Sequence, residues 1–204
     1  MDLQYSFIHG SPIAWSDDLF SEQELGKIYK ECDTIRKQGL LKEDTHGARR
    51  DGNLLKKNKG LFFEEHFGGN SQPPETVITI AKKIYNEEFV CNMEKLHPYF
   101  RLLRQSDGST NLLSYYDTSD YYKPHMDDSS ITVLLWLYKE PKTYTGGDFI
   151  IEHDFELECK RGRILFMPGW LYHEVTPVKM WADYQGQGLG RYSISHFVNA
   201  RRIR

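Results

Sequence analysis

The sequence predicts a mainly β protein of the sandwich or jelly-roll type, with helices packed against the outside of the sheets. Helical periodicity dominates the residues before 107, whereas the residues after it form short runs rich in Val, Ile, Tyr, Phe and Trp between turn signals. The chain has 204 residues, which is enough to bury a sizeable core without disulfides. Aromatic residues make up 14% of the chain, which excludes a disordered polymer.

The change of texture near residue 107 also predicts how the chain is organised. We expect one domain, 1–204, in which 1–106 form a mostly helical support region and 107–204 form a β core. The sequence has no run of 18 or more apolar residues, so we expect no membrane-spanning segment. The first residues lack the basic and apolar regions of a signal peptide, and the three cysteines are widely spaced, so we expect a cytoplasmic protein. A net charge of −3 disfavours nucleic acid as a partner.

A first helix is predicted from Ser21 to Gly39. Ser21 and Glu24 have the spacing of a capping box, in which the two side chains satisfy free backbone amides at the helix start. Apolar residues then recur at spacings of three and four, and Gly39 is a typical terminator. The predicted buried face consists of Leu25, Ile28, Cys32 and Ile35.

The segment 49–59 carries five basic residues. One interpretation is a solvated loop, and the other is a basic rim that meets an anionic substrate.

A second helix is predicted after Pro73 and Pro74. Its far end, around 86–98, is ambiguous and is compatible with another helix. The apolar stripe of this second helix consists of Val77, Ile80, Ala81, Ile84 and Tyr85.

The β half contains five predicted strands, at 111–116, 130–138, 148–151, 163–167 and 192–198. We expect turns at Asp107-Gly108, Gly146-Gly147 and Pro168-Gly169.

A candidate metal site lies in this β half. Residues two apart in a strand point to the same side, so His125 and Asp127 can converge on one point. With His173 they form two histidines and one carboxylate, a set that leaves metal positions open and suits non-haem Fe(II). Arg191, which shares a strand face with Ser193, can hold a carboxylate through two parallel hydrogen bonds.

Further motifs accompany this set, and all lie between Asn111 and Val198. Together they resemble the Fe(II)/2-oxoglutarate-dependent dioxygenases and, within them, the prolyl-4-hydroxylase-like branch. The motifs that carry the resemblance are Tyr115, Tyr122, His125-Met126-Asp127, Gly146-Gly147-Asp148-Phe149, Arg163-Ile164-Leu165-Phe166, His173-Glu174-Val175 and Arg191-Tyr192-Ser193-Ile194-Ser195.

The resemblance implies a fold, an activity and a set of cofactors. The fold would be a double-stranded β-helix, which is a cupin-like jelly roll, with supporting N-terminal helices. The activity would be the hydroxylation of a C–H bond with Fe(II), 2-oxoglutarate and O2, giving succinate and CO2, with ascorbate in a supporting role. The most expected substrate is a prolyl residue of a peptide or protein.

The resemblance also implies residue roles. His125, Asp127 and His173 would hold the iron and, with Arg191, would form the catalytic set. Arg191 would bind the distal carboxylate of 2-oxoglutarate, with Ser193 and Tyr115 as further cosubstrate contacts. The residues expected near the substrate are Tyr122 at the mouth, Phe197 as an aromatic wall and Trp181 in a nearby loop.

The sequence departs from the family pattern in two places. Many collagen-type prolyl hydroxylases carry a lysine where Arg191 stands, so the substrate class stays open. The segment between His173 and Arg191 is longer than is common in this branch, and its glycine-rich part, 179–190, is either a mobile lid or a plain surface loop.

Several alternatives stay open from the residues alone. The enzyme could hydroxylate a free amino acid or another small molecule, or it could be a jelly-roll metalloenzyme that uses the same triad without 2-oxoglutarate. A non-catalytic jelly-roll module that binds a ligand is a third possibility. His196 is the alternative metal ligand if His173 points away from the site.

Overall fold

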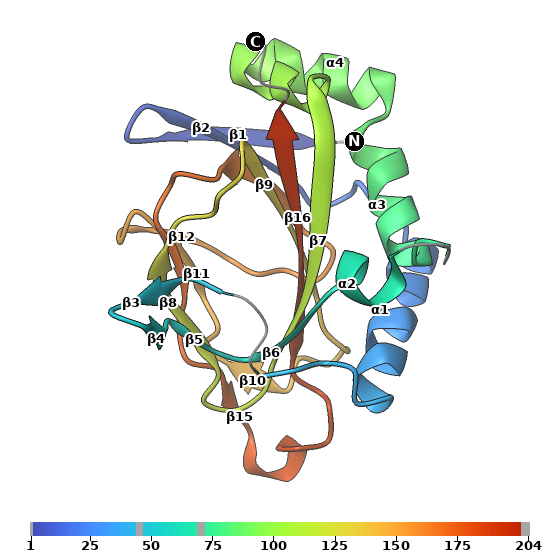
Figure 1. Ribbon diagram of the computed structural model, residues 1–204, viewed down its shortest axis with the longest axis vertical. Coiled ribbons are helices and arrows are strands. Elements are labelled where there is room, and N and C mark those ends of the chain that lie inside the picture. The colour runs from blue at the N-terminus through green and yellow to red at the C-terminus, as the bar shows by residue number, and fades with distance from the viewer. Residues whose placement is uncertain (1, 44–46, 69–71, 201–204) are drawn as a thin grey trace.

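Two antiparallel sheets and a layer of helices make up the structure, a computed structural model that describes residues 2–43, 47–68 and 72–200 (Figure 1). The helices are α1 (Glu22–Lys37), α2 (Phe63–Phe67), α3 (Glu75–Ile84) and α4 (Glu87–Leu96), with 3₁₀ turns at Pro98–Leu103 and Ala182–Tyr184. The strands are β1 (Leu3–Ile8), β2 (Ser11–Ser16), β3 (Arg49–Arg50), β4 (Asn53–Leu54), β5 (Lys56–Lys57), β6 (Lys59–Phe62), β7 (Ser106–Tyr116), β8 (Tyr121–His125), β9 (Ile131–Leu137), β10 (Tyr144–Thr145), β11 (Phe149–Ile151), β12 (Phe155–Leu157), β13 (Ile164–Pro168), β14 (His173–Val175), β15 (Lys179–Met180) and β16 (Arg191–Ala200).

The strand order is that of a jelly roll. The larger sheet has the order β1-β2-β13-β9-β16-β7-β6, and the smaller sheet has the order β12-β11-β14-β8-β5. The pairs β10-β15 and β3-β4 form two separate short ladders. The predicted fold class, a mainly β double-stranded β-helix with supporting helices, is confirmed.

Each face of the larger sheet packs against a different layer. One face packs on the helices, which lie together on one side of the molecule in Figure 1. The other face packs toward the smaller sheet, where Trp136 and Phe149 belong to the interior core. Both faces of the central strand β9 are therefore covered, which explains why all seven of its residues are buried.

The helix predictions are confirmed in type and position. In α1, Ser21 and Glu24 form the expected capping box, and the four predicted apolar residues are buried. The ambiguous stretch after α3 is a separate helix, α4, because the Asn86 side chain accepts a hydrogen bond from the Phe89 amide and starts a new helix there.

The strand predictions are confirmed in the core, and one predicted turn is wrong. The five expected strands correspond to β7, β9, β11, β13 and β16. The expected turn at Asp107-Gly108 is wrong, because β7 runs through it and Gly108 pairs with Asn199 of β16. The region 1–106 supplies β1 to β6 in addition to its helices. The expected division of one domain into a mostly helical region, 1–106, and a β core, 107–204, stays a prediction.

None of the helices in the described ranges combines the length and the apolar character that crossing a membrane requires.

The capping box of α1 makes a prediction about stability. Replacing Ser21 with Ala should lower the free energy of unfolding by about 1 kcal/mol, because the Glu24 amide loses its hydrogen-bond acceptor. Ser21→Asn supplies another side-chain acceptor and should stay close to the native value. Urea unfolding of the three proteins measures both effects, and equal losses in the two variants would contradict a capping role.

Candidate metal centre

Three predicted ligands converge between the two sheets. His125 ends β8, His173 begins β14, and the two residues are directly opposite each other in the β8-β14 pair. Asp127 follows β8 by two residues, and its carboxylate lies 3.7 Å from His125 Nε2 and 3.4 Å from His173 Nε2. One ligand atom from each residue lies within 4.8 Å of the other two. This spacing is suitable for three ligands around one ion.

Backbone contacts orient both imidazole rings. The Nδ1 atom of His125 lies 2.9 Å from the Lys123 carbonyl oxygen, and that of His173 lies 2.9 Å from the Leu171 carbonyl oxygen. A carbonyl only accepts, so Nδ1 carries the proton in each ring and Nε2 presents a lone pair toward the third ligand. Burial, followed by the charge of His173, lowers the pKa of His125 to about 2, so this ring is neutral near pH 7.

The Asp127 carboxylate is held from two directions. Its Oδ2 accepts a hydrogen bond of 2.7 Å from the Thr132 hydroxyl, and its backbone amide donates to the Gly169 carbonyl at 2.8 Å. A side chain on Gly169 would come within 2.3 Å of the Ser129 carbonyl oxygen, so only glycine allows this close approach. The turn before β14 thereby fixes the segment that carries Asp127.

A cavity of about 380 Å³ opens over the three ligands. The Tyr122 ring stacks on His125, with 3.5 Å between ring centroids and an interplanar angle of 11°. Its hydroxyl accepts a hydrogen bond of 2.7 Å from the Ala48 amide, which ties the segment before β3 to the site. Other residues that line this cavity are Phe62, Tyr116, Trp136, Phe149, Ser193 and Phe197.

Arg191 is a fully buried cation without a carboxylate partner among the described residues. Its Nη1 donates to the Gly147 carbonyl at 2.7 Å and lies 2.7 Å from Cys159 Sγ, and its guanidinium lies 4.9 Å from the centre of the Tyr116 ring. Its Nε and Nη2 have no hydrogen-bond partner. A buried guanidinium with two free donors is suited to a carboxylate ligand.

Three residues with unpaired polar atoms near this site were not predicted from the sequence. The hydroxyl of Tyr144 has no partner, and burial raises its pKa, with the nearby charge of Arg191 opposing that rise. Lys56 and Asn58 are buried with unpaired nitrogen and oxygen atoms. Burial lowers the pKa of Lys56 to about 8. No sequence signal distinguishes the last two, because all four residues of 56–59 are polar.

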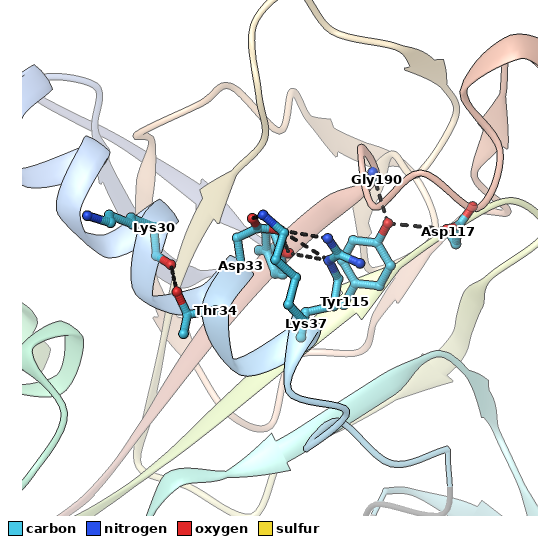
Figure 2. Close-up of polar contacts among 9 residues, drawn as sticks. Lys30, Asp33, Thr34, Lys37, Tyr115, Asp117 and Gly190 are labelled. Carbon is cyan, nitrogen blue, oxygen red and sulfur yellow. Dashed lines mark hydrogen bonds and ion pairs between the residues drawn. The ribbon is translucent and has the colours of Figure 1, made fainter.

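The predicted role of Tyr115 is not supported by its position. Its hydroxyl donates to Asp117 and accepts from the Gly190 amide, and its ring packs with Tyr192 on the helix side of the larger sheet (Figure 2). The next residue, Tyr116, points to the opposite face and lines the cavity. A shift of one residue along β7 exchanges the two faces, so Tyr116 and not Tyr115 lines the cavity. The cosubstrate contact expected of Tyr115 stays a prediction.

A polar cluster on the same helix side fixes β16 to α1. The Tyr192 hydroxyl accepts a hydrogen bond of 3.0 Å from Arg36 Nε and donates to Asp33 at 3.2 Å. The Arg36 guanidinium also lies 5.6 Å from the centre of the Tyr115 ring. Figure 2 shows Asp33 of α1 and Tyr115 of β7 in this cluster.

The other predicted residues divide into two groups. Ser193, Tyr122 and Phe197 line the cavity as expected. Trp181 does not line it, because its side chain is 52% exposed and packs on Tyr184 in the 3₁₀ turn of the 179–190 segment. Whether that segment acts as a lid stays an open prediction.

His196 takes no part in the candidate metal centre. Its Nδ1 lies 2.6 Å from Asn111 Oδ1 and its Nε2 lies 2.9 Å from the Tyr85 hydroxyl, on the helix side of the larger sheet. Since His173 faces the site, the alternative ligand is not needed.

The burial of His196 predicts how stability depends on pH. Burial lowers the pKa of this imidazole to about 4, against about 6.5 in the unfolded chain. Between these values only the unfolded state takes up the proton, so stability falls as the pH drops through this window. The free energy of unfolding, measured with urea, should therefore fall less in His196→Gln than in the native protein when the pH is lowered from about 7 to about 5. The expected difference is about 2 kcal/mol. The exposed His66 provides the control variant His66→Gln, and an unchanged pH dependence in His196→Gln would contradict the explanation.

Comparisons with known proteins agree with this geometry. A family model described as the 2OG-Fe(II) oxygenase superfamily matches residues 110–199, a range that contains all three candidate ligands and Arg191. No curated protein matches the chain.

Similar solved structures cover almost the whole chain. A prolyl-4-hydroxylase from Pseudomonas putida is 14% identical, with a TM-score of 0.59 over 93% of this chain and 93% of that one. A prolyl hydroxylase from Trichoplax adhaerens, in complex with a hypoxia inducible factor peptide fragment, is 14% identical, with a TM-score of 0.66 over 92% and 83%. A viral collagen prolyl hydroxylase from Paramecium Bursaria Chlorella virus-1 is 17% identical, with a TM-score of 0.56 over 93% and 96%.

These structures share the fold of the chain, and the family model covers the segment that forms the site. The donor set of two imidazoles and one carboxylate fits ferrous iron, and the unpaired donors of Arg191 fit a dicarboxylate cosubstrate. Residues 110–199 of the chain therefore match the 2OG-Fe(II) oxygenase superfamily, and the fold is like that of the prolyl-4-hydroxylases.

Proposed function

We propose that this oxygenase hydroxylates a prolyl residue of a peptide or protein and releases succinate and CO2. The observation that carries the proposal is the pairing of the His125, Asp127 and His173 triad, which lines the cavity, with a buried Arg191. The Arg191 guanidinium has two unpaired nitrogens and lies 4.9 Å from the ring of Tyr116 in the cavity wall. The triad has the chemistry of an iron site, and the arginine has the chemistry of a site for the distal carboxylate of 2-oxoglutarate.

The residues of the chain would contribute geometry and a dry environment. His125 Nε2, Asp127 and His173 Nε2 would hold the ion on the side of the cavity formed by the smaller sheet. Arg191 would fix the far end of the cosubstrate, which lowers the entropic part of the barrier. Bound ferrous iron would supply the oxygen chemistry that couples oxidation of the 2-oxo acid to hydroxylation of the substrate.

The walls of the cavity support a ring-shaped aliphatic substrate. Phe197 and Phe62 line the cavity and pack on each other, with 6.5 Å between ring centroids. Apolar walls of this kind fit the pyrrolidine ring of proline, and Tyr122 offers a polar position beside the triad.

The opening of the cavity and the structures with a similar fold support a proline that is part of a peptide. Gly47 and Ala48 line the cavity and lead directly into the exposed basic strand β3, so the rim suits an extended chain with acidic groups. Three structures with the same fold are prolyl hydroxylases, and one of them contains a peptide fragment.

Removing one ligand should abolish metal binding. His173→Ala should weaken the affinity for Fe(II) or Co(II), measured by calorimetry without oxygen, by more than about 100-fold. Glu174, the next residue of β14, lies on the opposite face of the strand, and Glu174→Ala is the matched control. Native affinity in His173→Ala would exclude the triad as the metal site.

The prolyl substrate is tested by mass spectrometry. The protein is incubated with Fe(II), 2-oxoglutarate, ascorbate and a library of proline-containing peptides, and we expect a peptide that gains one oxygen atom on proline while succinate accumulates. A matched library with alanine in place of proline should show no oxygen gain. Oxygen transfer to another residue, or only to free amino acids, would overturn the prolyl-peptide assignment and leave the oxygenase class intact.

A further inference from the structure

The segment from β5 to β6 alternates between interior and surface. Lys56 and Asn58 are 5% and 3% exposed, whereas the side chains of Lys57 and Lys59 are more than half exposed. Period-two alternation of this kind is that of extended chain with one buried face. Two of the basic residues of segment 49–59 thus remain on the rim, while Lys56 enters the interior.

The interior pair lies directly behind the cavity wall. Lys56 pairs with Tyr122 in the smaller sheet, and its Nζ lies 6.0 Å from the centre of that ring. A side chain on Gly47, which lines the cavity, would meet Lys56 Cε at 2.8 Å. Because Lys59 pairs with Tyr115, Asn58 is level with Tyr116, another residue of the wall.

The polar atoms of this pair are unsatisfied. Neither Lys56 Nζ nor the two polar atoms of the Asn58 amide have a hydrogen-bond partner in the described part of the chain. A buried ammonium without an anion is strongly unfavourable, and each unpaired amide atom adds a further cost. Arg191 also has unpaired donors, and its guanidinium lies 4.9 Å from the centre of the Tyr116 ring. Buried, unpaired cations therefore lie behind two residues of the cavity wall, Lys56 behind Tyr122 and Arg191 beside Tyr116.

We propose that Lys56 and Asn58 form a second anion-binding position, which contacts the iron-side carboxylate of the 2-oxo acid while Arg191 holds the distal one. Tyr122 joins the two places, since it stacks on His125 and pairs with Lys56. Because Lys56 and Asn58 are almost fully buried, they suit a small anion inside the protein better than an acidic side chain of a protein docked on the surface. This inference rests on the proposed use of 2-oxoglutarate.

The test separates the two ends of the cosubstrate. Protein loaded with Zn(II), which does not turn over, is titrated by calorimetry with 2-oxoglutarate and with 2-oxobutanoate, which lacks the distal carboxylate. Lys56→Met should weaken both ligands to a similar degree, by at least about 10-fold, the effect of one charge-assisted hydrogen bond. Arg191→Met should weaken 2-oxoglutarate far more than 2-oxobutanoate.

Two controls keep the result interpretable. Lys57→Met changes the neighbouring outward lysine and should leave both affinities unchanged. The apo form of Lys56→Met should unfold at the same temperature as the native protein or higher, because the variant removes a buried unpaired charge.

Two results would overturn the inference: native affinity for both acids in Lys56→Met, or a loss confined to 2-oxoglutarate. If the native protein itself binds neither acid, the use of 2-oxoglutarate fails together with the inference.

Discussion

The pairing of β8 with β14 is the constraint on which the candidate metal centre depends. It places His125 opposite His173, and only then can Asp127, two residues beyond the strand, reach both rings. The backbone carbonyls that receive the two Nδ1 protons belong to the same two segments. Each of the two segments therefore both positions its histidine and selects the tautomer that a metal requires.

The interior between the sheets is unusual for a protein core because cationic side chains outnumber their partners there. Arg191 and Lys56 are both buried, and each retains nitrogen atoms without an acceptor among the described residues. Such groups cost stability in the empty protein, and bound carboxylates would recover that cost. Binding of such a ligand would therefore raise folding stability through these side chains.

The sequence predicted the parts of the site that depend on spacing, and it could not predict those that depend on register. The two histidines, Asp127 and Arg191 were found because their order and residue types are specific. The sequence motif does not show which of Tyr115 and Tyr116 faces the cavity, because moving one residue along a strand changes the face and leaves the motif almost unchanged. Lys56 was counted within a basic segment, since only the strand pairing shows that it turns inward.

The cluster that joins α1 to β16 has a consequence for how errors in folding are avoided. If β16 slipped by one position, Tyr192 would take the place of Arg191 on the strand face that lines the cavity, and a phenol would replace the guanidinium there. The Tyr192 hydroxyl can form its hydrogen bonds with Arg36 and Asp33 only in the register in which Tyr192 faces the helix, so these bonds stabilise that register alone. Helix α1, which does not line the cavity, thus helps to select the correct register of β16, the strand that forms part of the cavity wall.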